Sequence, residues 1–144
     1  MTMPDVRMRK ATLADTAALA RMNKQLIEDE GHDNPMTVRE LQARMVSFLT
    51  TDYTAYLAEI DDGGEPAGYC LYRHEGEAFY LRHLFTSRQQ RRQGIATAML
   101  NWLFAHIFQH APVRLDVLAH NHGAIRFYER FGFEIACLTY RLTR

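Results

Sequence analysis

The chain has 144 residues, 47% of them hydrophobic, so it is long and apolar enough to bury a core and is not expected to be disordered. Its 17 basic and 17 acidic residues cancel, which argues against a general binder of nucleic acids or anionic membranes. The two cysteines, Cys70 and Cys137, form no CxxC pair, and the sequence shows neither a signal peptide nor an apolar run of membrane-span length. We therefore expect a soluble protein of the reducing cytoplasm.

Apolar periodicity predicts alternating strands and helices in the first half of the chain. A strand over residues 6–11 precedes a helix that runs to about Asp29, and Thr12 with Asp15 forms the capping box before it. Thr37 and Glu40 repeat that pattern ahead of a second helix. Three strands then follow, over residues 54–60, 67–73 and 78–86.

The second half continues this mixed order of elements. A helix follows residue 94, and a strand over residues 113–118 comes next. A short helix opens at Asn121 and closes at Gly132, and a last strand is predicted over residues 134–142. We infer one mixed α/β (α+β) domain over residues 1–144, with antiparallel strands at its centre.

The stretch RRQGIA at residues 91–96 starts a helix on glycine, with two arginines and no Ser, Thr, Asp or Asn cap. A helix N-terminus carries unpaired N–H groups and about half a positive charge, so a phosphate can bind there. The stretch matches neither the Walker pattern nor the dinucleotide GxGxxG pattern. By itself it indicates either a diphosphate site or a solvated basic loop.

Two motifs, correctly spaced, resemble those of the GNAT superfamily of acetyl-CoA-dependent N-acetyltransferases. The first is RxxGxA after a long strand, and the second has the form N-x-x-A-x-x-F-Y-E-x-x-G-F. The matching residues are Arg91, Gly94 and Ala96 in the first, and Asn121, Ala124, Phe127, Tyr128, Glu129, Gly132 and Phe133 in the second. The resemblance covers nearly the whole chain. It implies a mixed, mostly antiparallel central sheet, flanked by helices and splayed between the fourth and fifth strands.

The resemblance also implies acetyl-CoA as co-substrate. The pantetheine arm is expected to lie between the splayed strands, beside a bulge that frees backbone N–H groups. Asn121 is expected to contact this arm as well as to cap its helix. The backbone groups expected along the arm belong to Leu84, Phe85 and Thr86. The pyrophosphate is expected at Arg91, Arg92, Gln93, Gly94, Ile95 and Ala96.

Tyr128 matches the general acid that protonates the departing CoA thiolate in this family. A phenol with a pKa near ~10 is a plausible proton donor to a thiolate. The alternative is an amphipathic core tyrosine, since Ala124, Phe127 and Phe131 continue the same apolar helix face.

The strand ahead of the expected bulge is where the general base is sought. Related enzymes often carry a Glu or His two or four positions ahead of the bulge, and here those positions hold Arg82 and Tyr80. Arginine is not a base at ordinary pH. Strand alternation places His83 on the face opposite Tyr80, Arg82 and Leu84, although a bulge shifted by one residue reverses this. His83 is therefore one candidate base.

The segment IEDEGHDN at residues 27–34 offers further candidates for the acceptor site. In the family the first helix and the loop after it wall the acceptor, so Glu28 is a candidate base or acceptor contact. Glu30 and His32, with Tyr80 and Arg82, are candidate substrate contacts. The alternative is a solvated helix end, the usual interpretation of a charge run. The pair His120 and His122 lacks further metal ligands at typical spacing, so no metal site is expected.

The leading prediction is an enzyme that moves acetyl from acetyl-CoA to a primary amine, with a small molecule as the expected acceptor. A protein or peptide acceptor is one alternative, and a non-catalytic acyl-CoA sensor is another. Nucleic-acid binding through Arg88, Arg91 and Arg92 is disfavoured by the zero net charge. The family usually ends in two strands, whereas about a dozen residues follow Gly132 here. We therefore expect an exposed edge that a second subunit closes in a homodimer.

Overall fold

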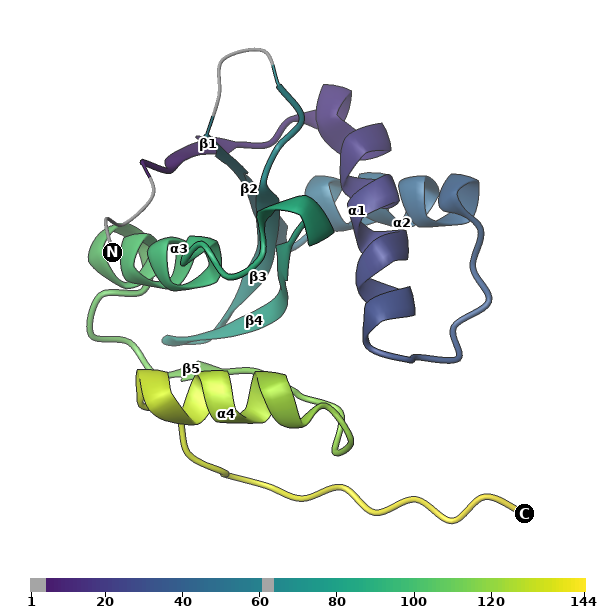
Figure 1. Ribbon diagram of the computed structural model, residues 1–144, viewed down its shortest axis with the longest axis vertical. Helices are drawn as coiled ribbons and strands as arrows, with labels where there is room; N and C mark the ends of the chain where they lie inside the picture. Colours follow the sequence, from purple (N-terminus) through teal and green to yellow (C-terminus); the bar gives the residue numbers. More distant parts are fainter. Residues whose placement is uncertain (1–4, 61–63) are drawn as a thin grey trace.

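The computed structural model describes residues 5–60 and 64–144. Their strands form one mixed sheet in the order β1-β2-β3-β4-β5, antiparallel except for the parallel pair β4 and β5 (Figure 1). The strands are β1 (Arg7–Lys10), β2 (Tyr53–Glu59), β3 (Gly68–Glu75), β4 (Ala78–Thr86) and β5 (Val113–Arg114). This architecture confirms the predicted mixed, mostly antiparallel sheet.

Helices cover both faces of the sheet (Figure 1). Residues of α1 (Thr16–Asp29) and α2 (Val38–Thr50) pack with β2, β3 and β4 in one core cluster. The other face is covered by residues of α3 (Ile95–Leu103), of the π-helical turn Phe104–Phe108 and of α4 (His122–Phe131). In the part of the chain that the structure describes, no helix is long and apolar enough to cross a membrane.

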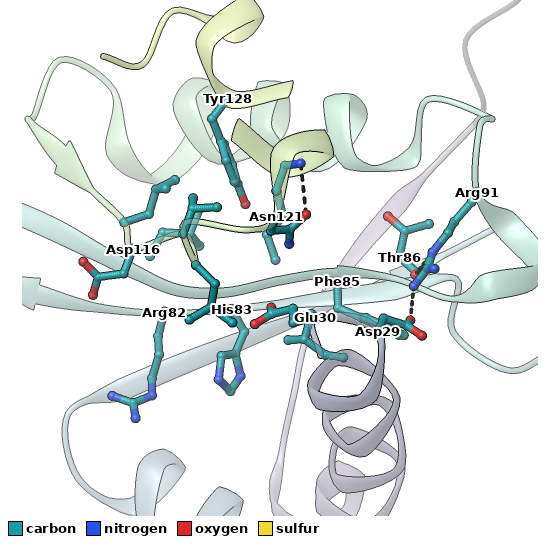
Figure 2. A pocket seen from close by; sticks show the side chains of 17 residues that line it. Asp29, Glu30, Arg82, His83, Phe85, Thr86, Arg91, Asp116, Asn121 and Tyr128 are labelled. Carbon is teal, nitrogen blue, oxygen red and sulfur yellow. Dashed lines mark hydrogen bonds and ion pairs between the residues drawn. The ribbon is translucent and has the colours of Figure 1, made fainter. Parts of the chain in front are cut away.

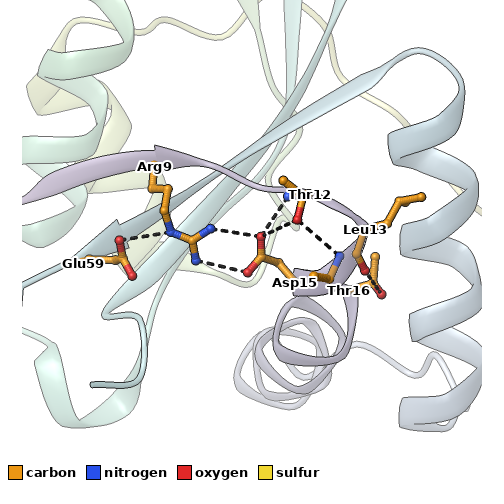
Figure 3. A network of polar contacts seen from close by, with 7 residues as sticks. Arg9, Thr12, Leu13, Asp15, Thr16 and Glu59 are labelled. Atoms are coloured by element: carbon orange, nitrogen blue, oxygen red, sulfur yellow. Dashed lines mark hydrogen bonds and ion pairs between the residues drawn. The ribbon is translucent and has the colours of Figure 1, made fainter. Parts of the chain in front are cut away.

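Both predicted capping boxes are confirmed. The Thr12 hydroxyl accepts from the Ala14 amide at 3.3 Å, while Asp15 accepts from the Thr12 amide at 2.8 Å, and a short 3₁₀ turn then leads into α1. The Arg9 guanidinium also donates to Asp15 and to Glu59, so one ion-pair network joins β1, β2 and the start of α1 (Figure 3). These contacts fix the angle at which the chain leaves the sheet to form α1.

β4 and β5 pair only at Phe79 with Val113 and at Tyr80 with Arg114. The predicted strand over residues 113–118 is therefore too long, because β5 ends at Arg114. Beyond these pairs the two chain segments part and leave one edge of β4 without a neighbouring strand. The predicted splay between the fourth and fifth strands is thus confirmed.

A β-bulge in β4 overturns the predicted orientation of His83. Leu71 pairs with His83 while Tyr72 pairs with Leu81, so Arg82 is the extra residue. Arg82 Nη1 donates to the Tyr53 hydroxyl at 3.2 Å, and His83 Nδ1 shares a 3.0 Å hydrogen bond with the Tyr69 hydroxyl. Tyr53 and Tyr69 both belong to the core on the α1 and α2 face. The extra residue therefore places His83 on the same face as Arg82, and simple alternation is wrong here.

The predicted last strand over residues 134–142 is also wrong. The chain there is irregular, and it leaves α4 and runs away from the body of the molecule (Figure 1). Its apolar side chains are exposed, with Leu138 at 65% and Tyr140 at 89%. A strand requires a hydrogen-bonded neighbour, and no described segment of this chain pairs with residues 134–142.

Candidate active site

A cleft of about 270 Å³ opens where β4 and β5 part. One wall is the free edge of β4, the other is the chain between β5 and α4, and the C-terminal end of α1 closes one side (Figure 2). The predicted site residues that line it are Glu30, Arg82, His83, Leu84, Phe85, Thr86, Arg91, Asn121 and Tyr128. Glu28, His32, Tyr80 and residues 92–96 do not line it. The sheet geometry thus brings together most of the predicted contacts of the cofactor arm.

The N-terminus of α3 lies at the end of the loop that follows β4. Gly94 caps this helix with φ +78°, a conformation that suits glycine, and no side chain caps the first turn. The side chain of Ile95 is buried in the core, so only its backbone is available to a ligand. The first-turn N–H groups therefore present the positive end of the helix dipole, as a diphosphate site requires.

Two arginines of this loop pair with Asp29 at the end of α1. Arg88 reaches Asp29 at 2.7 Å, and Arg91 donates to the same carboxylate and, through Nε, to the Thr86 carbonyl at 3.2 Å. Burial alone would raise the pKa of Asp29, but the hydrogen bonds from Arg88 and Arg91 outweigh it and lower that pKa. Sequence reasoning missed Asp29. Its only signal was its place in the acidic run between Glu28 and Glu30.

Thr86, at the end of β4, has a buried hydroxyl oxygen with no hydrogen-bond partner among the described residues. It lines the cleft beside the unpaired edge of β4. A buried polar atom without a partner costs free energy, and a polar ligand in the cleft can satisfy it. The amide groups of a pantetheine arm fit this requirement, so the residues present suit acetyl-CoA.

Tyr128 projects from α4 with its hydroxyl group directed into the cleft (Figure 2). Burial, with a smaller contribution from the Glu30 carboxylate, raises the pKa of Tyr128, so the phenol stays protonated at neutral pH. Asn121 caps α4 by accepting from the Ala124 amide at 3.3 Å, as predicted (Figure 2). This cap sets the direction of the helix that carries Tyr128.

Glu30, the C-cap residue of α1, places its carboxylate in the cleft (Figure 2). Burial raises the pKa of this half-buried carboxyl, which makes it a better proton acceptor once ionised. His120 Nε2 lies 2.6 Å from the Glu30 carbonyl oxygen and so ties the end of α1 to the loop before α4. Glu28, in contrast, lies outside the cleft, 3.9 Å from Arg88, and His32 hydrogen-bonds to the Asn34 amide.

The remaining predicted residues, His83 and Tyr80, have partners of their own: Tyr69 for His83 and Asp116 for Tyr80. Burial, and then the nearby charges of Arg44 and Arg82, lowers the pKa of His83 to about 3, so this imidazole is a weak base. The Tyr80 hydroxyl donates to Asp116 at 2.9 Å. Asp116 lines the cleft, and sequence reasoning missed it because it was read as part of a longer strand.

Comparison with known proteins agrees with this fold and cleft. The sequence profile of the acetyltransferase (GNAT) family matches residues 19–133, so the chain belongs to this family. Members of the family are acetyltransferases that use acetyl-CoA. Among curated proteins none matches the chain in sequence.

Solved structures show the same fold at low sequence identity. A predicted acetyltransferase from Clostridium acetobutylicum, determined with acetyl-CoA, is 20% identical with a TM-score of 0.74, covering 96% of each chain. An acetyltransferase from Thermus thermophilus is 20% identical with a TM-score of 0.75, covering 93% of this chain and 90% of its own. A ribosomal-protein-alanine N-acetyltransferase from Brucella melitensis is 17% identical with a TM-score of 0.73, covering 97% and 100%.

Proposed function

We propose that this protein transfers acetyl from acetyl-CoA directly to the primary amine of a small molecule. The observation that carries the proposal is one cleft with a free strand edge on one side and the Tyr128 hydroxyl on the other (Figure 2). Family membership supports acetyl transfer, and the uncapped start of α3 supports a diphosphate-bearing donor.

The cofactor-binding residues have separate tasks. The free edge of β4, from Leu84 to Thr86, offers backbone groups and the Thr86 hydroxyl to the pantetheine arm. The N–H groups after Gly94 bind the diphosphate, and Arg91 lies close enough to the cleft to add positive charge. Bound acetyl-CoA supplies the activated acetyl group.

Glu30 and Tyr128 are the residues that we assign to the two proton transfers, Glu30 as base and Tyr128 as acid. An alkyl ammonium must lose its proton before it attacks a carbonyl, and the Glu30 carboxylate in the cleft is the group we assign to accept it. A new C–N bond then replaces the C–S bond, and the Tyr128 hydroxyl donates a proton to the sulfur that leaves. The second proton that the nitrogen loses restores the Tyr128 hydroxyl. An N–H of the free β4 edge stabilises the negative charge on the carbonyl oxygen.

The direct test is acetyl-CoA binding by calorimetry, together with thiol release in the presence of a panel of small primary amines. Binding and amine-dependent thiol release support the proposal. Thiol release with peptides alone assigns a peptide acceptor instead. Binding with no turnover of any amine or peptide favours a non-catalytic acyl-CoA sensor, and absence of binding refutes the proposal.

A further inference from the structure

Arg82 is held at the margin of the cleft by aromatic rings rather than by an acid. Its guanidinium carbon lies 5.0 Å from the Phe48 ring centroid and 5.8 Å from that of Tyr53. Its Nη1 donates to the Tyr53 hydroxyl at 3.2 Å, yet the side chain is exposed and lines the cleft. Stacking therefore orients the guanidinium and leaves hydrogen-bond donors for a ligand.

A second arginine shares the same ring. Arg44, on α2, lies 5.4 Å from the Phe48 centroid and donates to Asn23 at 2.9 Å. Its Nε is buried without a partner, and burial followed by the charge of Arg82 lowers the pKa of Arg44. Two guanidinium groups thus flank Phe48 and repel one another.

No carboxylate among residues 5–60 and 64–144 forms an ion pair with Arg44 or Arg82. Two neighbouring arginines that stack on rings of the same cluster do have acidic partners: Arg73 pairs with Glu75 at 3.2 Å. Arg114 pairs with Glu75 at 2.6 Å and with Asp116 at 3.8 Å. The positive charge at this margin of the cleft is therefore left uncompensated by the described residues, and only Arg82 of the pair is exposed there.

We infer that Arg82, supported by the charge of Arg44, binds an anionic group of the acceptor, so the acceptor is a small primary amine that also carries a carboxylate or a phosphate. The inference rests on the proposed function and names its substrate class. A guanidinium matches the planar, two-oxygen geometry of these anions better than any other side chain. Glu30 lines the same cleft with the opposite charge, so an acceptor with one positive and one negative end is oriented by both.

The test uses matched pairs of amines that differ only in the acid group. Phenylalanine is compared with phenethylamine, and phosphoethanolamine with ethanolamine, by thiol release from acetyl-CoA with the intact protein. We expect kcat/KM to be about tenfold to a hundredfold higher for the acidic member of at least one pair. The pair that shows the preference distinguishes carboxylate from phosphate.

Arg82→Gln is expected to abolish this preference through the acceptor KM, with the KM for acetyl-CoA and the melting temperature unchanged. Arg73→Gln is the matched control, because Arg73 stacks on Tyr53 and Tyr80 but is already paired with Glu75. The control should keep the preference. Equal loss for acidic and neutral amines in Arg82→Gln, or no preference in the wild type, overturns the inference while amine acetylation stands.

If acetyl-CoA binds but no amine of the panel is turned over, binding of phenylalanine and of phosphoethanolamine is measured by calorimetry. Binding of either by the wild type and its loss in Arg82→Gln support the anion site independently of turnover. Absence of binding in the wild type overturns it.

Discussion

Two parts of the molecule differ in how tightly they are packed. Within the described chain every buried residue lies at or before Phe108, and nearly all of them belong to β2, β3, β4, the first three helices and the π-helical turn. From residue 109 to residue 144, which includes β5 and α4, no residue is fully buried. Segments with few buried contacts open at a lower free-energy cost than the core.

The cleft lies between these two parts. The well-packed part provides Glu30, Arg82 and the edge of β4, and the loosely packed part provides Asn121 and Tyr128. A ligand that bridges them gains affinity only if α4 is in place, and it stabilises α4 in return. The difference therefore indicates that donor binding and the position of Tyr128 are linked.

The largest expected effect is loss of acetyl-CoA binding at the start of α3, which belongs to the well-packed part. Gly94→Glu should abolish acetyl-CoA binding, because a carboxylate at the start of α3 repels the diphosphate, and like charges in contact cost several kcal/mol. Calorimetry measures the affinity. Gly94→Asn is the control: asparagine tolerates the positive φ at this position and carries no charge, so binding should largely survive. Unchanged affinity in the Glu variant would disprove the diphosphate position.

Tyr128→Phe tests the contribution of the loosely packed part. Removing the hydroxyl should lower turnover by about 10²–10⁴-fold, the usual range for general acid catalysis, with acetyl-CoA affinity nearly unchanged. The ring is retained, so its contacts with Phe127 and Phe133 persist and the melting temperature should change little. Turnover within about threefold of wild type, well below that range, would make Tyr128 a structural residue.

Glu30→Gln tests the base on the opposite side of the cleft. We expect turnover at neutral pH to fall by about 10²-fold. In the wild type, activity should rise with pH through the raised pKa of Glu30, and this limb should disappear in the variant. The charges of Asp29, His32 and His120 also act on the pKa of Glu30, so they help to set the pH at which this rise occurs.

Glu30→Gln should lower turnover without lowering the stability of the fold. Burial raises the folded-state pKa of Glu30, so its ionised form destabilises the fold above that pKa. The variant should therefore melt at the same temperature as the wild type or higher at pH 7. A lower melting temperature together with unchanged turnover would contradict the assignment of Glu30.

The features that the sequence predicted are those set by local chemistry. The bounds of β4 and both capping boxes follow from residues within a few positions of each other, and the motif around Asn121 carries the helix cap with it. The bulge at Arg82 was not predictable in detail, because it depends on register with β3. Asp29 pairs with Arg88 and Arg91, which lie about sixty positions further along the chain. Sequence patterns over a few neighbouring residues do not predict such a contact.

A smaller effect is expected on dimer formation, from substitutions in the exposed segment over residues 134–142. Leu138, Tyr140 and Leu142 alternate along it as on one face of a strand, and the outer edge of β5 has no neighbour in the described sheet. We expect the segment of one copy to pair with β5 of a second copy and form a dimer. Leu138→Lys should weaken this dimer about 10- to 100-fold, from the apolar burial lost.

Light scattering over a range of concentrations measures this assembly. Thr139→Lys is the matched control, because residue 139 points to the opposite face of an extended strand and should leave the dimer intact. A monomeric wild type at high micromolar concentration would contradict the expectation.

The smallest expected effect lies at the junction of α1 with the loop after β4. Asp29→Asn removes the carboxylate that pairs with Arg88 and Arg91, and because both arginines are largely exposed we expect a loss of about 0.2–1 kcal/mol in unfolding free energy. The folded-state pKa of Asp29 is lowered, so this stabilisation is present above its unfolded pKa and is lost as pH falls through the folded value. Denaturant unfolding of wild type and variant at pH 7 should therefore differ slightly, and the difference should shrink in strong acid or at high salt.

Glu28→Gln is the control, since Glu28 lies 3.9 Å from Arg88 and is exposed, and it should change stability less. A large loss in Asp29→Asn, of several kcal/mol, would mean that this junction belongs to the cooperative core of the packed part.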